Sequence, residues 1–238
     1  MKGRTKLALV TNACLALLVL AVAAVCFLPA GIPASSLADR VYYNGDREGV
    51  RVSLMFNVYW GGEYLGGILD VLEEYGVYAT FFIGGCWADD NAELVREIAE
   101  RGHELGNHGY FHKDQDKLGY DGNAEEIASC GKLLYTLTGR EVTLFAPPSG
   151  AYSEDTVRAA EELGYSVILW SKDTIDWRDH DATLIYRRAT ENVQGGDLVL
   201  MHPTAATLEA LPSVLAQYAR LGLVQSVVSA NIAGESGA

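Results

Sequence analysis

Three histidines have neighbours and a spacing that could support chemistry. His108 and His112 are four residues apart, so both ring nitrogens could bind one metal ion if the two side chains share a helical face. His202 closes an apolar run and precedes Pro203, which fits a histidine at the end of a strand. Each feature alone is also consistent with a hydrogen-bonded structural histidine, and the surrounding elements must therefore decide between these interpretations.

Apolar runs typical of buried strands alternate with amphipathic helical segments, which predicts an α/β fold with a parallel sheet covered on both faces. Strands are expected at residues 50–58, 77–83, 143–145, 166–170, 197–201 and 224–228. Helices are expected at 65–75, 91–101, 123–137, 153–163, 182–193 and 207–221. The intervening residues 102–112 are expected to form a loop that holds the first histidines. In parallel barrels the reactive side chains occupy the carboxyl ends of the strands, and 238 residues suffice for one such barrel.

Five stretches in a fixed order make the chain similar to the polysaccharide deacetylases of the NodB-homology type, and most to their sporulation-associated branch. They are ILDVLEEYGVYATFFIGG (68–85), IAERGHELGNHGYFHKD (98–114), LFAPPSGAY (144–152), DTIDWR (173–178) and LVLMHPT (198–204). The resemblance covers residues 49 to 229. It implies a distorted (β/α) barrel of about seven parallel strands. It also implies an enzyme, a hydrolase that removes N-acetyl groups from a polymer such as peptidoglycan or chitin.

The same resemblance assigns roles to particular residues. A divalent metal, commonly zinc, would be held by His108, His112 and one aspartate, while a second aspartate would act as general base. His202 would be the general acid that protonates the leaving amine, and Asp176 would orient it. Pro147, Pro148 and Trp177 would form walls of the sugar groove. Tyr59 and Trp60 are further groove candidates, whereas Trp87 and Trp170 are expected to pack in the core.

Three positions depart from the family pattern. The first motif of the family reads Thr-Phe-Asp-Asp-Gly, but residues 55–59 here read Met-Phe-Asn-Val-Tyr. Asn57 therefore stands at the base position, and Val58 stands where the metal carboxylate is expected. An amide cannot take a proton at neutral pH, so Asn57 cannot replace the base. Ala146 replaces an arginine that pairs with the base aspartate in the family, so the two losses are electrostatically coherent.

Three functions remain open from these residues. The domain could still be a metal-dependent deacetylase, with Glu63, Asp114 or Asp173 as the third ligand. It could instead be a catalytically impaired member that binds glycan through Tyr59, Trp60 and Trp177. It could also be a structural partner in a membrane-anchored assembly. The predicted partner in the first two cases is cell-wall polysaccharide, and a monomer is expected.

The N-terminus predicts a membrane partner and an outward-facing domain. Residues 1–6 are basic, and residues 7–28 are apolar enough to span a bilayer as an uncleaved anchor. The alternative is a signal segment that is cleaved to give a secreted protein. Residues 29–48 are expected to be a linker, 49–230 the catalytic-type domain, and 231–238 a flexible tail.

Charge and cysteine content narrow the possible ligands. The chain has 18 Lys and Arg against 31 Asp and Glu, and Lys2, Arg4 and Lys6 precede the first acidic residue. The acidic remainder argues against nucleic acid as a partner and favours a neutral or cationic ligand.

Outside the predicted anchor only Cys86 and Cys130 remain, and two free buried thiols are expected rather than a metal knuckle.

Overall fold

A computed structural model describes residues 15, 17 and 36–234 of the protein. The chain divides into two units between Ser36 and Leu37, and the second unit holds everything discussed below. The predicted membrane segment 7–28 lies outside the described residues except for Leu15 and Leu17, which are helical. Among the residues that were placed, no helix has the length and apolar character needed to cross a membrane.

The second unit is built on a curled sheet whose strand pairs are all parallel. The strands are β1 Val41–Tyr42, β2 Arg51–Val58, β3 Thr80–Ile83, β4 Glu104–Asn107, β5 Leu144–Phe145, β6 Ser166–Ile168, β7 Lys172–Asp173, β8 Leu198–Met201 and β9 Val224–Gln225. Their order is β1-β6-β5-β4-β3-β2-β8-β7, with β9 paired to β2 off this path. The sheet is therefore an open half-barrel within the α/β class that the sequence predicts.

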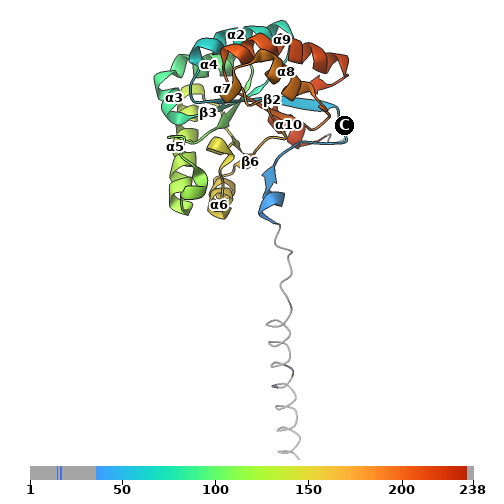
Figure 1. The fold of residues 1–238 in the computed structure, drawn as a ribbon. Helices are drawn as coiled ribbons and strands as arrows, with labels where there is room; N and C mark the ends of the chain where they lie inside the picture. The colour runs from blue at the N-terminus through green and yellow to red at the C-terminus, as the bar shows by residue number, and fades with distance from the viewer. Residues whose placement is uncertain (1–14, 16, 18–35, 235–238) are drawn as a thin grey trace, which may run out of the picture. The chain divides into compact units, whose positions relative to one another are not determined.

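Helices cover the outer face of this sheet, and α2, α4, α8 and α9 lie together over one part of it (Figure 1). The α-helices are α2 Gly62–Glu74, α3 Gly85–Asp90, α4 Ala92–Glu100, α5 Tyr120–Thr138, α6 Glu154–Glu162, α7 Asp176–Asp179, α8 Ala182–Thr190, α9 Ala205–Arg220 and α10 Val228–Ile232. Within residues 36–234, three 3₁₀ turns occur at Leu37–Arg40, Gln115–Lys117 and Pro148–Gly150. Ser153 caps α6 with its side chain, as the sequence predicts for a serine before a helical segment.

The strand β2 shows how the core separates into two layers. All of its residues except Arg51 are buried, because helices cover one face and the curled sheet encloses the other. Val52, Leu54, Phe56 and Val58 belong to the apolar cluster that packs between sheet and helices. Met55 packs on the opposite, inner side with residues such as Phe82 and Leu200. Side chains alternate along a strand, so Asn57 shares the inner face with Met55.

The folded unit extends beyond the predicted domain at both ends. Leu37–Arg40 and Val41–Tyr42, predicted as linker, form a 3₁₀ turn and a strand that pairs with β6. Asn231, predicted as tail, is buried in α10 and donates a hydrogen bond to Ser53. Residues 235–238 lie outside the described residues. Short polar segments show little of the apolar periodicity that predicts helices and strands. Both ends are ordered by contacts with distant parts of the chain.

The strand β4 was predicted as loop, and its composition explains the error. Its sequence Glu-Leu-Gly-Asn has low strand propensity, and Gly106 lacks a side chain that could reveal alternation. A Cβ atom at Gly106 would lie 2.3 Å from Phe82, so the sheet accepts only glycine at this position. The strand therefore forms because it pairs with its neighbouring strands rather than through local preference. His108 follows its last residue directly.

Candidate functional site

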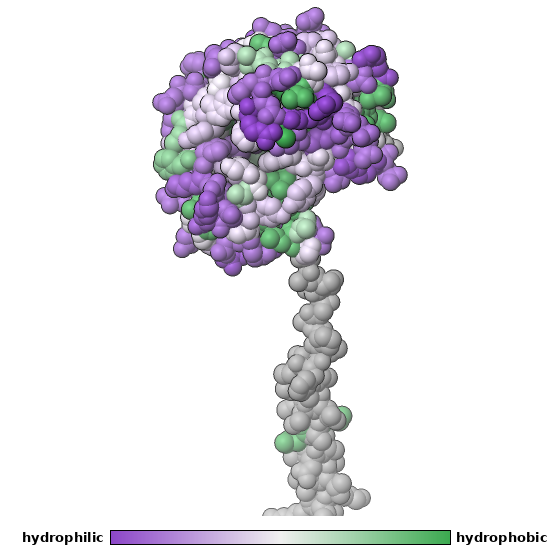
Figure 2. Space-filling view, viewed as in Figure 1, coloured by the Kyte–Doolittle hydropathy of each residue, from purple (hydrophilic) through white to green (hydrophobic). Residues whose placement is uncertain are grey.

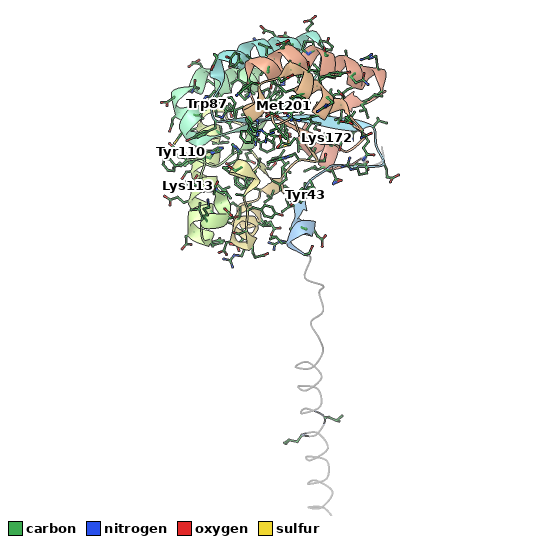
Figure 3. The ribbon with its side chains drawn as sticks, in the orientation of Figure 1. Tyr43, Trp87, Tyr110, Lys113, Lys172 and Met201 are labelled. Carbon is green, nitrogen blue, oxygen red and sulfur yellow. The ribbon has the colours of Figure 1, made fainter. Side chains whose placement is uncertain are left out.

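A cavity of about 460 Å³ opens where the parallel strands end. It receives Asn57 from the end of β2, His108 after β4, Asp173 from β7 and His202 after β8. Its lining comprises Asn57, Tyr59, Trp60, His108, His112, Ser149, Trp170, Asp173, Trp177, Leu200 and His202. Met201, the last residue of β8, lies near the centre of the folded unit (Figure 3). The carboxyl ends of distant strands thus gather the three histidines that the sequence singles out.

His108 is buried and held in one tautomer. Its Nδ1 lies 2.7 Å from the carbonyl oxygen of Ala146, which can only accept a hydrogen bond. Nδ1 therefore carries the proton, and Nε2 keeps a lone pair. Burial, followed by the nearby His112, lowers the pKa of His108 to about 3, so the ring is neutral at physiological pH. A neutral imidazole with a fixed Nδ1–H is the form in which histidine binds metal ions.

His112 is positioned by an unusual backbone and by ring stacking. Its φ of 53° lies in the left-handed region, which non-glycine residues adopt infrequently. Its ring is 5.1 Å from that of His108 and is stacked at 4.5 Å against Tyr59. Burial also lowers the pKa of His112. The two histidines are therefore neighbours, although they lie on a loop after β4 rather than on one helical face.

Glu126, which the sequence reasoning missed, fixes this loop from helix α5. Its Oε2 accepts the backbone N–H groups of Tyr110 at 3.0 Å and Phe111 at 2.8 Å. Lys113 pairs with the other carboxylate oxygen at 3.1 Å, and Figure 3 shows Lys113 beside α5. The only signal in the sequence was a glutamate on the mainly apolar face of α5 with Ile127 and Cys130.

His202 is paired with Asp176, as the family resemblance implies. The fully buried Asp176 carboxylate receives the His202 Nδ1–H at 2.8 Å and the His202 backbone N–H at 2.6 Å. It also accepts the Thr207 hydroxyl at 2.6 Å, and this third partner was not predicted. With Nδ1–H donated to the carboxylate, Nε2 of His202 is the nitrogen left to act in the cavity.

Backbone strain at Ile175 helps to place Asp176. Ile175 has φ 54°, a left-handed conformation that is rare for a β-branched residue. The Ile175 N–H donates to Asp173 Oδ1 at 2.8 Å, which stabilises the turn between β7 and α7. Strain of this kind concentrates at functional sites, and here it starts α7 at the residue that holds His202.

The first motif has lost its acidic character. Asn57 is 4% exposed and lines the cavity, and its Oδ1 has no hydrogen-bond partner among the described residues. Val58 is fully buried in the apolar cluster on the helix side of the sheet and does not line the cavity. Ala146 contributes only its carbonyl, which fixes His108. Asn57 and the Ala146 carbonyl thus lie at the cavity, whereas the Val58 side chain faces the helices.

The residues present do not fit a catalytic zinc site. Such a site needs three protein ligands and an open position, and Val58 offers no ligand. Within residues 36–234 no three His, Cys, Asp or Glu side chains lie close enough together to hold a metal ion. Of the third-ligand candidates, Asp114 is paired with Lys117 at 2.5 Å, and Glu63 is exposed at the start of α2. Asp173 lines the cavity but completes no ligand group with the histidine pair.

Aromatic side chains form much of the cavity wall. Trp60 stacks on His202 with ring centroids 5.9 Å apart and an interplanar angle of 3°. Trp177 is 49% exposed at the rim, as the predicted groove role requires. Trp170 packs against two apolar clusters, as predicted, and also lines the cavity, while Trp87 is buried as predicted.

The turn at residues 147–149 contributes one residue to the cavity wall. Pro147 and Pro148 do not line the cavity, and the next residue, Ser149, does. Pro148 is buried within the 3₁₀ turn, where its ring supports the turn rather than the groove. Ser149 adopts φ 57° in that turn. Leu200 was also missed as a lining residue, because an apolar residue inside a strand gives no signal of an exposed face.

Cys86 and Cys130 are the cysteines in the described part of the chain, and they lie outside the cavity lining. They form no disulfide, in agreement with the prediction of free thiols, but only Cys130 is buried and Cys86 is half-buried. Burial raises the pKa of Cys130 to about 12, so it behaves as an inert packing residue.

Buried neutral histidines predict that acid destabilises the fold. Burial lowers the pKa of His103 to about 4 and that of His108 to about 3, whereas unfolding returns both to about 6.5. The unfolded chain then binds protons that the folded chain does not, so the free energy of unfolding should fall as pH drops from about 6.5 towards 4. In chemical denaturation, the free energy of unfolding of His103→Gln should fall less steeply with decreasing pH than that of wild type. The control His180→Gln, at an exposed position, should follow the wild-type curve. A His103→Gln curve parallel to wild type would contradict this.

The half-barrel with a histidine pair and an Asp–His pair at its strand ends defines a carbohydrate-esterase type of domain. Residues 44–168 match the sequence family described as polysaccharide deacetylase, and the chain belongs to this family of hydrolases. The resemblance inferred from the five motifs is thereby confirmed at the level of the family.

The relatives include an uncharacterized protein, a peptidoglycan deacetylase and a pseudoenzyme. The chain is 34% identical to the uncharacterized protein YlxY of Bacillus subtilis over 82% of its length and 61% of that protein. It is 32% identical to a peptidoglycan-N-acetylglucosamine deacetylase of Bacillus cereus, over 67% of this chain and 77% of the relative. Among solved structures it resembles BA3943, a CE4 family pseudoenzyme from Bacillus anthracis, with 32% identity and a TM-score of 0.79. That match covers 81% of this chain and 68% of the other, and a mutant of BA3943 is described as having restored enzymatic activity.

Proposed function

We propose that this chain is a membrane-anchored, outward-facing member of the polysaccharide deacetylase family that binds cell-wall amino-sugar glycan without hydrolysing it at family rates. The observation that carries the proposal is that the cavity keeps one set of family residues and lacks another. The Asp176–His202 pair and the aromatic walls are intact, while Asn57 and Val58 remove the base and the metal carboxylate. The similarity to a family pseudoenzyme and to a peptidoglycan deacetylase supports both halves of this proposal.

Aromatic faces would supply the binding energy. A pyranose ring presents C–H groups that pack on indole faces, and Trp60 and Trp177 are 41% and 49% exposed at the cavity. Trp60 is already held in place by His202, so little side-chain freedom is lost on binding. The domain would bind peptidoglycan or a chitin-like N-acetylglucosamine polymer, and the sporulation-associated branch remains a prediction from the five motifs.

Loss of either exposed indole should weaken glycan binding. Trp60→Ala and Trp177→Ala are each expected to reduce affinity for peptidoglycan about 3- to 10-fold, the range for one aromatic contact. Tyr135→Ala serves as the control, because Tyr135 is 55% exposed on α5 and lies outside the cavity lining. Co-sedimentation with purified peptidoglycan measures the effect. Equal loss in all three variants would show that the cavity is not the glycan site.

Hydrolysis is the second candidate function, and the intact acid side favours it. His202 Nε2 faces the cavity with Asp176 behind it, so the imidazole could hand a proton to a leaving amine. Asn57, at the base position of the family, is an amide and accepts no proton, and burial lowers the pKa of His108 to about 3, which makes that ring a weak base. An acid without its base or a complete metal site cannot supply the full family mechanism.

The location follows from the basic and apolar N-terminus. The full chain should stay with the membrane fraction after alkaline carbonate extraction, and protease added outside intact cells should digest residues 37–238. A mature protein recovered from the medium without its first residues would instead support the secreted alternative.

A further inference from the structure

The cavity lining includes hydrogen-bond acceptors and one carboxylate. Its lining includes the carboxylate of Asp173, and no lysine or arginine is among the described residues that form it. The Asp176 carboxylate lies directly behind His202. The surface in view is mainly hydrophilic (Figure 2), and acidic residues outnumber basic ones by 31 to 18 over the whole chain. Such a charge balance attracts cations and repels anions.

Asn57 supplies an acceptor that the protein leaves unused. The side chain is 4% exposed and lines the cavity, and within residues 36–234 its Oδ1 has no hydrogen-bond partner. An amide oxygen can only accept hydrogen bonds, and a buried acceptor without a donor is unfavourable. The oxygen itself is buried, so a ligand that rotates the amide and brings an N–H donor to this oxygen would remove that cost.

Aromatic rings complete the surroundings of this acceptor. Tyr59, Trp60, Trp170 and Trp177 all line the cavity. The faces of such rings carry partial negative charge and attract ammonium groups, most strongly for tryptophan. Acceptors, a carboxylate and several aromatic faces around one cavity form a setting suited to an organic cation.

We propose that the cavity takes the primary ammonium group of a deacetylated glucosamine unit in preference to an acetamido group. An ammonium group has three N–H donors, which can serve Asn57 Oδ1 and Asp173 together. An acetamido group brings one N–H donor and no charge. This inference rests on the proposed glycan-binding function and specifies it, because the chain would then recognise polymer from which other enzymes have removed acetyl groups.

Calorimetric titration of the full 238-residue chain in detergent tests this preference. The probes are a glucosamine tetramer and an N-acetylglucosamine tetramer at about pH 6, where the amines are charged. The glucosamine tetramer should bind at least about tenfold more tightly, and this advantage should shrink as salt is added.

Two substitutions and one control sharpen the result. Asp173→Asn keeps the acceptor for the Ile175 N–H and should weaken glucosamine binding about tenfold. Asn57→Asp should strengthen it, because the acceptor becomes charged. Glu100→Gln removes the same charge from an exposed position at the end of α4, and it should leave the affinity unchanged.

The outcomes separate this inference from the proposed function. Tighter or equal binding of the acetylated tetramer would overturn the ammonium preference and leave glycan binding standing. Binding of neither tetramer would overturn the proposed function itself. An equal loss in Asp173→Asn and Glu100→Gln would show that overall charge, rather than the cavity, attracts the amine, and this too would overturn the inference.

Discussion

Val58→Asp is expected to lower the free energy of unfolding by about 3–5 kcal/mol in the presence of a chelator, the usual cost of an uncompensated buried charge. Val58 is fully buried in the apolar cluster between β2 and the helices, and nothing there offers a positive charge. Added zinc should recover part of this loss, because the family pattern places a metal carboxylate at this position beside His108 and His112. A ligand that binds only the folded state at 1,000 times its Kd contributes about 4 kcal/mol.

Val58→Asn is the matched control for this experiment. It introduces a polar group of the same size and should destabilise the fold, but it supplies no anionic ligand and should gain nothing from zinc. Asn57→Asp alone should leave acetate release at the background level, since Val58 still denies the third ligand. A Val58→Asp protein that ignores zinc, or a large gain in activity from Asn57→Asp alone, would show that this metal site has been misjudged.

Asp176→Asn should be the most damaging single change in the part of the site that is intact. The buried carboxylate accepts three hydrogen bonds, from the His202 ring, the His202 backbone and Thr207. An asparagine at this position turns one acceptor oxygen into a donor that faces a donor, and a loss of about 3–5 kcal/mol is expected. Thermal and urea unfolding would measure the loss.

Asp179→Asn provides a comparison on the same short helix. Asp179 is paired with Arg178 and Arg188 but is more exposed, so solvent compensates for the lost charge and the effect should be smaller. If both variants unfold alike, Asp176 does not have the structural importance that its burial indicates. Loss of His202 order should also appear as a changed histidine NMR signal in Asp176→Asn alone.

The sequence was informative about the cavity because parallel strands end at one edge of the sheet. His108, Asp176 and His202 are far apart along the chain, yet each follows or approaches a strand end, and the fold brings them together. The apolar runs predicted most of the strands because strands of a parallel sheet are buried on both faces. They were not able to predict β4, where Gly106 is required by contact with Phe82 rather than by local preference.

Hydrogen bonds that involve a backbone group escaped prediction. Ala146 contributes a carbonyl oxygen to His108, and Glu126 accepts two backbone N–H groups below the histidine loop. Neither function depends on a side-chain pattern that can be read along the chain. The choice between Ser149 and Pro148 as a wall residue likewise depends on the local turn, which only the folded structure defines.

The central claim is that the cavity binds amino-sugar glycan but lacks the groups to hydrolyse it. The most direct measurement is acetate release from N-acetylglucosamine oligomers and from peptidoglycan, with zinc added and glycan binding recorded on the same sample. Wild type is expected to bind glycan and to release no more acetate than His202→Ala. Acetate release clearly above that variant would contradict the claim and establish the chain as a working deacetylase.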